Sequence, residues 1–288
     1  CPNLPNRSHC LNDAVCWLLR ALGWGTLCGM RILFLGDVVG RAGRRGVERI
    51  LPEWQARYAP DIVIANGENA AGGMGITPDI ANELFGMGIE VITLGNHVWQ
   101  KKEIYPMLDA DPRLIRPANY PPGVPGRGWN VFPVLDKQLA VMVLAGRVFM
   151  EQADCPFRVF DALRPQIETP FLLIDFHAEA TSEKAAFALY ADGRVSAIIG
   201  THTHVQTADE RVLPGGTAFI SDVGMCGPLH SVIGMEPEIV IRRFLTGMPA
   251  KFEVAKGAPV ICGVLLDLDR SSGRALSIQR LQHRWLDG

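Results

Sequence analysis

The chain has 288 residues, of which 48% are hydrophobic and 20% charged, and its formal net charge is -2. These are ordinary globular values, so a disordered chain is not expected, and the length allows one large α/β domain or at most two domains. The near-neutral charge gives no global basic field, which argues against a dedicated nucleic-acid surface. No apolar run reaches the roughly 18 residues that a membrane span requires.

The cysteines are unevenly distributed along the chain. Four of the seven stand at positions 1, 10, 16 and 28, and the others are Cys155, Cys226 and Cys262. The body of the chain therefore has the pattern of a reduced, cytoplasmic protein, with no CxxC metal motif. Because the opening residues do not match the rest of the chain, we expect 1–29 to be a non-native or disordered leader and 30–288 a single domain. A signal peptide is the alternative, but Arg20 interrupts its apolar stretch.

The first predicted strand, residues 31–35, runs into Gly36-Asp37. An acidic residue just past a buried strand suits a metal carboxylate or a helix N-cap. The glycines that come next do not have GxGxxG spacing, so we expect no dinucleotide site. Residues 44–58 have apolar residues at helical spacing and predict a helix on the sheet. Four arginines near its start could steer a phosphate, although we expect at least two to form only a solvated helix face: Arg41, Arg44, Arg45 and Arg49.

Two further strands end in polar residues. Residues 61–65 lead into Asn66-Gly67-Glu68-Asn69, and residues 90–94 lead into Gly95-Asn96-His97. Between them Thr77 is expected to cap a helix that begins at Pro78. Strict βα alternation with right-handed crossovers brings such strand ends to one edge of a sheet. We therefore expect Asp37, Glu68, Asn69, Asn96 and His97 to lie at one edge.

The middle of the chain predicts a second sheet. Residues 113–134 are rich in Pro and Gly and read as a long ordered loop. Residues 129–134 and 139–144 are two β-like runs that predict a hairpin opening the second sheet. Residues 146–165 show no clear period, which indicates a loop or cap.

The second half repeats the pattern of apolar strands that end in histidine. An apolar run from Phe171 leads to His177, and a helix over 182–190 is expected to be capped by Thr181 or Ser182. The strand at 195–199 leads into GTHTH at 200–204, where alternation would place His202 and His204 on the same side. Such a pair suits a transition metal, whereas a surface or core pair is the alternative. A strand (217–224), a helix (236–245) and an antiparallel pair (260–268 with 275–281) complete the chain.

Eight polar side chains are thus expected at or just beyond strand ends: Asp37, Glu68, Asn69, Asn96, His97, His177, His202 and His204. A set of carboxylates, amides and imidazoles without a thiolate suits two divalent ions such as Fe, Mn or Zn. A carboxylate can bridge two ions held about 3.5–4 Å apart, which clamps the oxygens of a phosphoester displacement. A bridging hydroxide would then attack, because bound metals lower the pKa of water.

Several motifs carry a resemblance to a known family. Gly36-Asp37, Gly95-Asn96-His97, the lone His177 and GTHTH resemble the calcineurin-like metallophosphoesterases. GDVVGR (36–41), NGENA (66–70), GNHVW (95–99) and DFHAEATSEK (175–184) resemble the bacterial YmdB-type subfamily more closely, from Met30 to the C-terminus. The resemblance implies an α/β fold, a four-layer α/β/β/α sandwich with the active site at strand carboxyl ends. It also implies phosphodiesterase activity on cyclic nucleotides, with 2′,3′-cyclic AMP the preferred class.

The resemblance also implies residue roles. One metal would be held by Asp37, Glu68, Asn69 and His204, and the other by Glu68, Asn96, His177 and His202, with Fe favoured over Mn or Zn. His97 would be the general acid that protonates the leaving oxygen. The chain departs from the wider superfamily in three ways: Val39 replaces the histidine of the opening Asp-x-His, Glu68 replaces the bridging Asp, and Val98 replaces the acidic residue after Asn-His.

Other functions stay open from the sequence. One alternative is a metal-binding regulatory protein of RNA turnover with vestigial catalysis, and another is a metal-dependent phosphomonoesterase. For single residues, His97 could instead be a structural histidine and Asn69 could cap a turn. The expected partner is a small-molecule phosphodiester, with no membrane contact, and formation of a homo-oligomer is left open.

Overall fold

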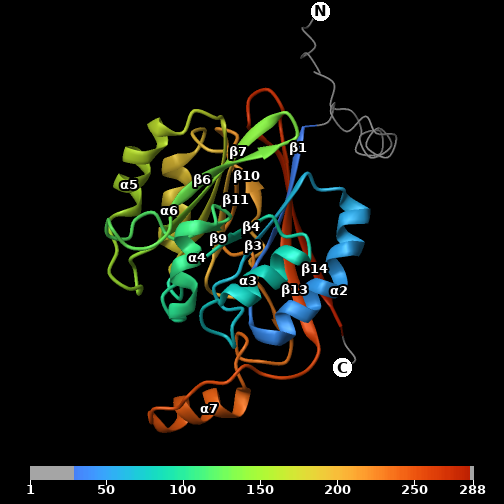
Figure 1. Cartoon of the computed structure of the whole chain (residues 1–288), viewed down its shortest axis with the longest axis vertical. Coiled ribbons are helices and arrows are strands. Elements are labelled where there is room, and N and C mark those ends of the chain that lie inside the picture. Colours follow the sequence, from blue (N-terminus) through green and yellow to red (C-terminus); the bar gives the residue numbers. More distant parts are fainter. Residues whose placement is uncertain (1–28, 286–288) are drawn as a thin grey trace, which may run out of the picture.

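Two β-sheets pack face to face, and helices cover their outer faces (Figure 1). The computed structural model describes residues 29–285, so the expected leader, Gly29 apart, lies outside the described residues. Helices α2 (Gly40–Tyr58) and α3 (Pro78–Gly86) share an apolar layer with the first sheet. Helices α5 (Pro156–Leu163) and α6 (Thr181–Ala191) do so with the second. A third apolar layer lies between the sheets. The predicted four-layer α/β/β/α sandwich is therefore confirmed.

The first sheet has eight strands in the described chain, and it is mixed. Its order is β2 (Asp37–Val38), β12 (Met225–Pro228), β13 (Pro259–Leu268), β1 (Met30–Leu35), β3 (Ile62–Asn66), β4 (Val91–Thr93) and β5 (Leu114–Ile115), and β14 (Ala275–Arg284) pairs with β13. β13 is antiparallel to its neighbours β1 and β12. β1, β3, β4 and β5 pair in parallel, so their carboxyl ends meet at one edge. That edge carries the residues that follow β3 and β4.

The second sheet presents its parallel strand ends to the same region. Its order is β10 (Arg211–Val212), β11 (Ala218–Ile220), β9 (Ala197–Thr201), β8 (Phe171–His177), β7 (Lys137–Ala145) and β6 (Trp129–Val134). β6 and β7 form the predicted hairpin, and β7, β8, β9 and β11 are parallel. His177 is the last residue of β8, and His202 follows β9 directly.

The remaining helices are short. They are α4 (Tyr105–Ala110), α7 (Pro237–Thr246) and the 3-10 turns Lys102–Ile104 and Arg164–Gln166. α7 projects from the body at the bottom of Figure 1. Among residues 29–285, no helix is both long and apolar enough to cross a membrane.

Three local predictions were wrong. α5 lies where a loop or cap was expected, because its eight residues span only about two turns, too few to reveal a period. α2 begins at Gly40, four residues before the predicted start, since its first turns are glycine-rich and lack an apolar pattern. α6 has Ala180 at its N-cap without a side-chain hydrogen bond, so neither Thr181 nor Ser182 caps it as expected.

Two glycines bring α2 close to the first sheet. A Cβ on Gly43 would lie 2.0 Å from the carbonyl oxygen of Cys226, and one on Gly46 would lie 2.6 Å from the side chain of Ile261. By contrast, a Cβ on Gly86 in α3 would meet nothing within 4 Å. The position of α2, which directly follows β2 and its Asp37, therefore depends on the absence of a side chain at Gly43 and Gly46.

Gly43→Ala is expected to lower the free energy of unfolding by about 1–3 kcal/mol, because the methyl group overpacks a backbone contact. Thermal or denaturant unfolding measures the change. Gly86→Ala is the matched control, and it should be neutral or slightly stabilising because it restricts the unfolded chain. An unfolding midpoint for Gly43→Ala equal to that of the parent would show that α2 can move away at no cost.

Candidate metal centre

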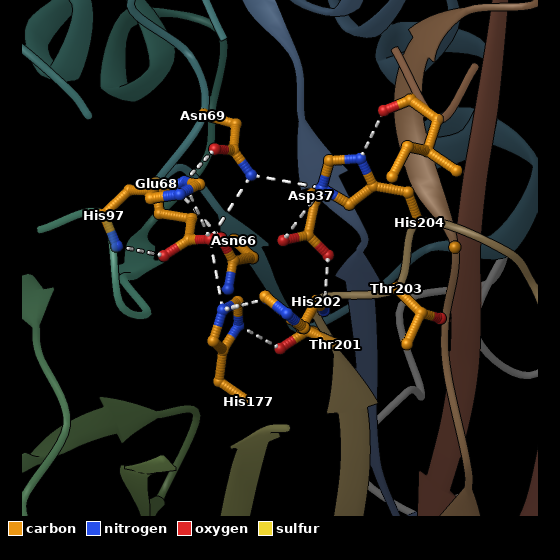
Figure 2. Close-up of polar contacts among 12 residues, drawn as sticks. Asp37, Asn66, Glu68, Asn69, His97, His177, Thr201, His202, Thr203 and His204 are labelled. Carbon is orange, nitrogen blue, oxygen red and sulfur yellow. Dashed lines mark hydrogen bonds and ion pairs between the residues drawn. The ribbon is translucent and has the colours of Figure 1, made fainter. Parts of the chain in front are cut away.

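All eight predicted residues converge between the carboxyl ends of the two sheets. Figure 2 labels all of them except Asn96. The first sheet supplies Asp37 in β2 and the residues just after β3 and β4, and the second supplies those at the ends of β8 and β9. Asp37, Glu68, Asn69, Asn96 and His97 therefore come from the first sheet, and the strand ends of the second sheet face them.

Four atoms from four residues converge at the side chain of His177. Its Nε2 lies 3.1 Å from Oε1 of Glu68, 2.9 Å from Oδ1 of Asn96 and 3.1 Å from Nδ1 of His202. Nε2 of His202 lies 3.1 Å from Oε2 of Glu179, so a proton on that nitrogen leaves a lone pair on Nδ1. One proton on His177 cannot serve three acceptors equally, whereas a cation among the four atoms can. Glu68, His177 and His202 offer ligand atoms within 4.8 Å of one another.

Asp37 forms the second part of the site. It is fully buried, and its Oδ2 accepts a hydrogen bond of 3.2 Å from the backbone N–H of His202. Its Oδ1 has no hydrogen-bond partner in the described part of the chain, and Nε2 of His204 lies 3.8 Å away. A buried carboxylate oxygen without a donor is costly. A cation between Asp37 and His204 would remove that cost, so these residues also fit a metal.

Close approach of the β4 loop requires a glycine. A Cβ on Gly95 would lie 2.3 Å from Nε2 of His177 and 2.4 Å from Oε2 of Glu68. With no side chain there, the next residues turn over the carboxylate, and the backbone N–H of His97 donates to Oε2 of Glu68 at 3.0 Å. The Gly-Asn-His motif is therefore explained by packing as well as by its polar side chains.

The backbone conformation of the GTHTH loop corrects one prediction. His202 and His204 have φ values of 97° and 66°, so the loop is not extended and alternation does not place the two rings. They reach the site because the chain turns at each histidine. A buried ion pair supports this turn, since Oδ2 of Asp222 accepts from Nζ of Lys184 at 2.8 Å and from the backbone N–H of Thr203 at 3.0 Å.

A buried relay fixes the orientation of His177. Its Nδ1 lies 2.8 Å from Oγ1 of Thr201, and that hydroxyl donates to Oδ1 of Asp175 at 2.6 Å. Because the hydroxyl hydrogen is used on Asp175, the oxygen accepts from Nδ1–H, and Nε2 is directed at the site. Oδ2 of Asp175 is held by Thr93 and Asn66. These supporting residues were not predicted from the sequence. The one available signal was Asp175, an acidic residue inside an apolar strand.

The titration of the site reflects its burial and charge. Burial raises the pKa of Asp37 to about 7. Burial alone would lower the pKa of His177, but the carboxylate of Glu68 raises it to about 9. Burial and the neighbouring His177 lower the pKa of His202 to about 3, so its ring is neutral. Burial opposes ionisation of Glu68, yet the charge of His177 holds the pKa of that carboxyl below its usual range. Without a metal, protons on Asp37 and His177 therefore supply the positive charge that a bound cation would supply at this site.

The fold is of the metallophosphoesterase type, which implies divalent metal ions, and the carboxylate and imidazole groups gathered here fit such ions. The family model described as YmdB-like protein matches residues 33–281. The chain belongs to this family, which confirms the resemblance seen in its motifs.

Three relatives show how far the similarity extends. A 2′,3′-cyclic-nucleotide 2′-phosphodiesterase from Bacillus subtilis (strain 168) is 50% identical over 254 residues, which cover 88% of this chain and 96% of the relative. A crystal structure of a hypothetical protein from Thermus thermophilus has 44% identity and a TM-score of 0.85, over 88% of this chain and 99% of that one. The crystal structure of a novel phosphatase from Mycoplasma pneumoniae has 36% identity and a TM-score of 0.85, over 89% and 94%.

Lys184→Met is expected to destabilise the protein by about 3–5 kcal/mol, because it leaves the buried carboxylate of Asp222 unpaired. Denaturant unfolding measures the loss. Lys102→Met, at an exposed position, is the control and should have little effect. Adding Asp222→Asn to Lys184→Met should recover part of the loss, and a stable Lys184→Met variant would contradict the role of this ion pair.

Proposed function

We propose that this protein is a di-metal phosphodiesterase that hydrolyses 2′,3′-cyclic nucleotides, with 2′,3′-cyclic AMP as a preferred substrate. The observation that carries the proposal is the convergence of Glu68, Asn96, His177 and His202 from two sheets onto one point. The name of the Bacillus subtilis relative supports the substrate class. Hydrolysis at the 2′ ester adds one water, breaks the bond between phosphorus and O2′, and leaves a 3′-monophosphate.

The proposed ligand sets divide the site around Glu68. Asp37, Glu68, Asn69 and His204 would hold one ion, and Glu68, Asn96, His177 and His202 the other. Fe is the favoured metal from the family resemblance, with Mn or Zn as the alternatives, and the imidazole and oxygen donors of the described site, without a thiolate, fit all three. Two divalent ions would offset phosphoryl charge and lower the pKa of water.

Asn69 is the proposed ligand whose oxygen points away from the other ligands. Its Oδ1 lies 2.6 Å from Nδ1 of His97, while its Nδ2 lies 3.2 Å from Nε2 of His204. An amide nitrogen does not bind a divalent ion, so Asn69 would bind through Oδ1. That oxygen has two lone pairs, so it could accept from Nδ1–H of His97 with one and offer the other to an ion, and Asn69 would then link the metal set to His97.

His97 is proposed as the general acid. Its side chain is 23% exposed, the most open of the candidate rings in ion-pair contact, and its Nδ1 is held by Asn69. Its Nε2 has no hydrogen-bond partner in the described part of the chain and is available to the substrate. A protonated ring donates from both nitrogens, so Nδ1–H keeps the ring in place while Nε2–H passes to the leaving O2′.

A cytoplasmic location is part of the proposal. Cys155, Cys226 and Cys262 are free thiols, and burial raises the pKa of the Cys226 and Cys262 thiols. Free, unreactive thiols suit a reducing compartment. Cys226 is buried, as an inert core thiol is expected to be.

Elemental analysis of the purified protein, combined with hydrolysis of 2′,3′-cyclic AMP, tests the metal assignment. About two transition-metal ions per chain are expected, and Glu68→Gln should lose both metal and activity because the shared carboxylate is gone. Glu103→Gln, on the exposed surface, should change neither. A parent protein that binds no metal after Fe or Mn is supplied would remove the basis of the proposal.

His97→Asn is expected to keep its metal content and to lose about 10²–10⁴-fold in kcat, because only the proton donor is removed. Bis(p-nitrophenyl) phosphate and p-nitrophenyl phosphate should be compared in the same assay. Faster hydrolysis of the monoester by the parent would favour a phosphomonoesterase. Hydrolysis of neither ester nor 2′,3′-cyclic AMP by the metal-loaded parent would favour a regulatory protein with vestigial catalysis.

A further inference from the structure

A basic groove lies along α2, outside the cluster of carboxylates and imidazoles. Its volume is about 690 Å³, and its charged lining consists of Arg41, Arg45, Arg49 and Lys256. Ala42, Gly46, Gly72 and the other residues of 254–259 complete the lining, which contains no Asp or Glu. A Cβ on Gly72 or Gly257 would meet nothing within 4 Å, so both walls face open space.

The cations of this groove are not neutralised by the protein. Within residues 29–285, Arg41, Arg45 and Lys256 have no ion pair or side-chain hydrogen bond, and the guanidinium of Arg49 lies 4.8 Å from the ring of Trp285. Arg44 differs, because it pairs with Glu83 and donates to the backbone of Ala70. The net charge of the chain therefore does not describe this face, which is locally cationic and suited to a polyanion.

Both walls of the groove begin beside the candidate metal centre. α2 starts three residues after Asp37, and the N–H of Gly40 donates to the carbonyl of Asn69 at 2.9 Å. On the other wall, the N–H of Ala255 donates to the carbonyl of Gly234 at 3.0 Å. The residue before Gly234, Ile233, accepts from Nδ1 of His204 at 2.8 Å. α2 then runs away along the outside of the first sheet (Figure 1).

The spacing of the arginines suits a row of phosphates. Arg41, Arg45 and Arg49 follow one another at four-residue intervals, so they lie on one side of α2 with a rise of about 6 Å between neighbours. Successive phosphates of a nucleic-acid strand have a similar separation. Proteins that bind single strands use such positively charged grooves to follow the backbone.

We propose that this groove binds the upstream phosphates of an RNA strand whose 3′ end is a 2′,3′-cyclic phosphate. The inference rests on the proposed function and extends its substrate class from cyclic mononucleotides to cyclic-phosphate ends of oligoribonucleotides. The terminal ribose of such an end stays joined through its 5′ oxygen to the rest of the strand. A cyclic mononucleotide has no further phosphate to occupy the groove.

The chemistry of the substrate supports this assignment. A 2′,3′-cyclic phosphate forms when an RNA 2′-hydroxyl attacks the adjacent phosphorus and displaces the 5′ oxygen of the next nucleotide. RNA cleavage by internal transesterification is therefore the class of reaction that supplies this end. The enzyme would add one water to it, break the bond between phosphorus and O2′, place a proton on O2′ and leave a 3′-phosphate on the strand.

The test compares a pentaribonucleotide with a 2′,3′-cyclic phosphate end against 2′,3′-cyclic AMP, using the metal-loaded protein. The readout is the ratio of kcat/KM for the two substrates, in which general effects on the enzyme cancel. The parent should favour the oligonucleotide by about tenfold or more, and the advantage should fall as salt rises. The double variant Arg45→Gln with Lys256→Gln should lose most of that advantage, whereas the control Arg158→Gln, on exposed α5 surface, should keep it. A ratio near one in the parent, or one unchanged in the double variant, overturns the inference.

A binding measurement separates this inference from the proposed function. A labelled pentaribonucleotide with a 3′-phosphate should bind the parent in fluorescence anisotropy, and the double variant should weaken that binding about tenfold, with a smaller dependence on salt. If the parent hydrolyses neither substrate, the proposed function fails. The binding measurement alone then tests whether the groove binds RNA. Absence of RNA binding overturns the inference, as does tighter binding of a polyglutamate peptide, which would indicate an acidic protein partner.

Discussion

The burial of two carboxylates, Asp37 and Glu68, is the constraint on which the rest of the site depends. A buried charge is costly unless donors or opposite charges surround it. The loops after β4 and β9 supply the backbone N–H groups of His97 and His202, and the end of β8 supplies the ring of His177. Because the donors come from both sheets, the site is complete only when the two sheets are packed together.

The second sheet both contributes rings and holds them in place. Asp175 and Thr201 set the tautomer of His177, while Asp222 and Lys184 support the turn that carries His202 and His204. These groups are buried, where hydrogen bonds are strong and an unpaired polar atom is expensive. A network of this kind is stable only when it is complete, so the positive φ values at the two histidines are maintained by residues that never touch a substrate.

Residues near one another in sequence were predictable, and those joined only by the fold were not. The strands at 31–35, 171–175 and 260–268 were predictable because these runs are mostly apolar. The site was predictable because polar residues follow several strand ends. β2 and β12 were not predicted because each is short. They form by pairing with strands distant in the sequence, as when Met225 of β12 pairs with Asp37 of β2. Lys184 was missed for a similar reason. Its spacing in α6 places it on the buried face with Phe187, Ala188 and Ala191, but a lysine indicates a surface position, and only the distant Asp222 stabilises its buried charge.

The distribution of charge along α2 explains how a nearly neutral chain can have two faces of opposite character. Asp37, at the start of this segment, belongs to a site whose carboxylates attract protons or cations, and the exposed arginines begin only four residues later. Gly43 and Gly46 keep this helix close to the sheet, so the groove along α2 begins next to the anionic site. Once cations occupy the site, its field and that of the groove have the same sign. In the proposed complex, a strand whose terminal phosphate lies at the site would place its upstream phosphates along the arginines of α2, so the charges of the protein would set the orientation of the strand without contacts to the bases.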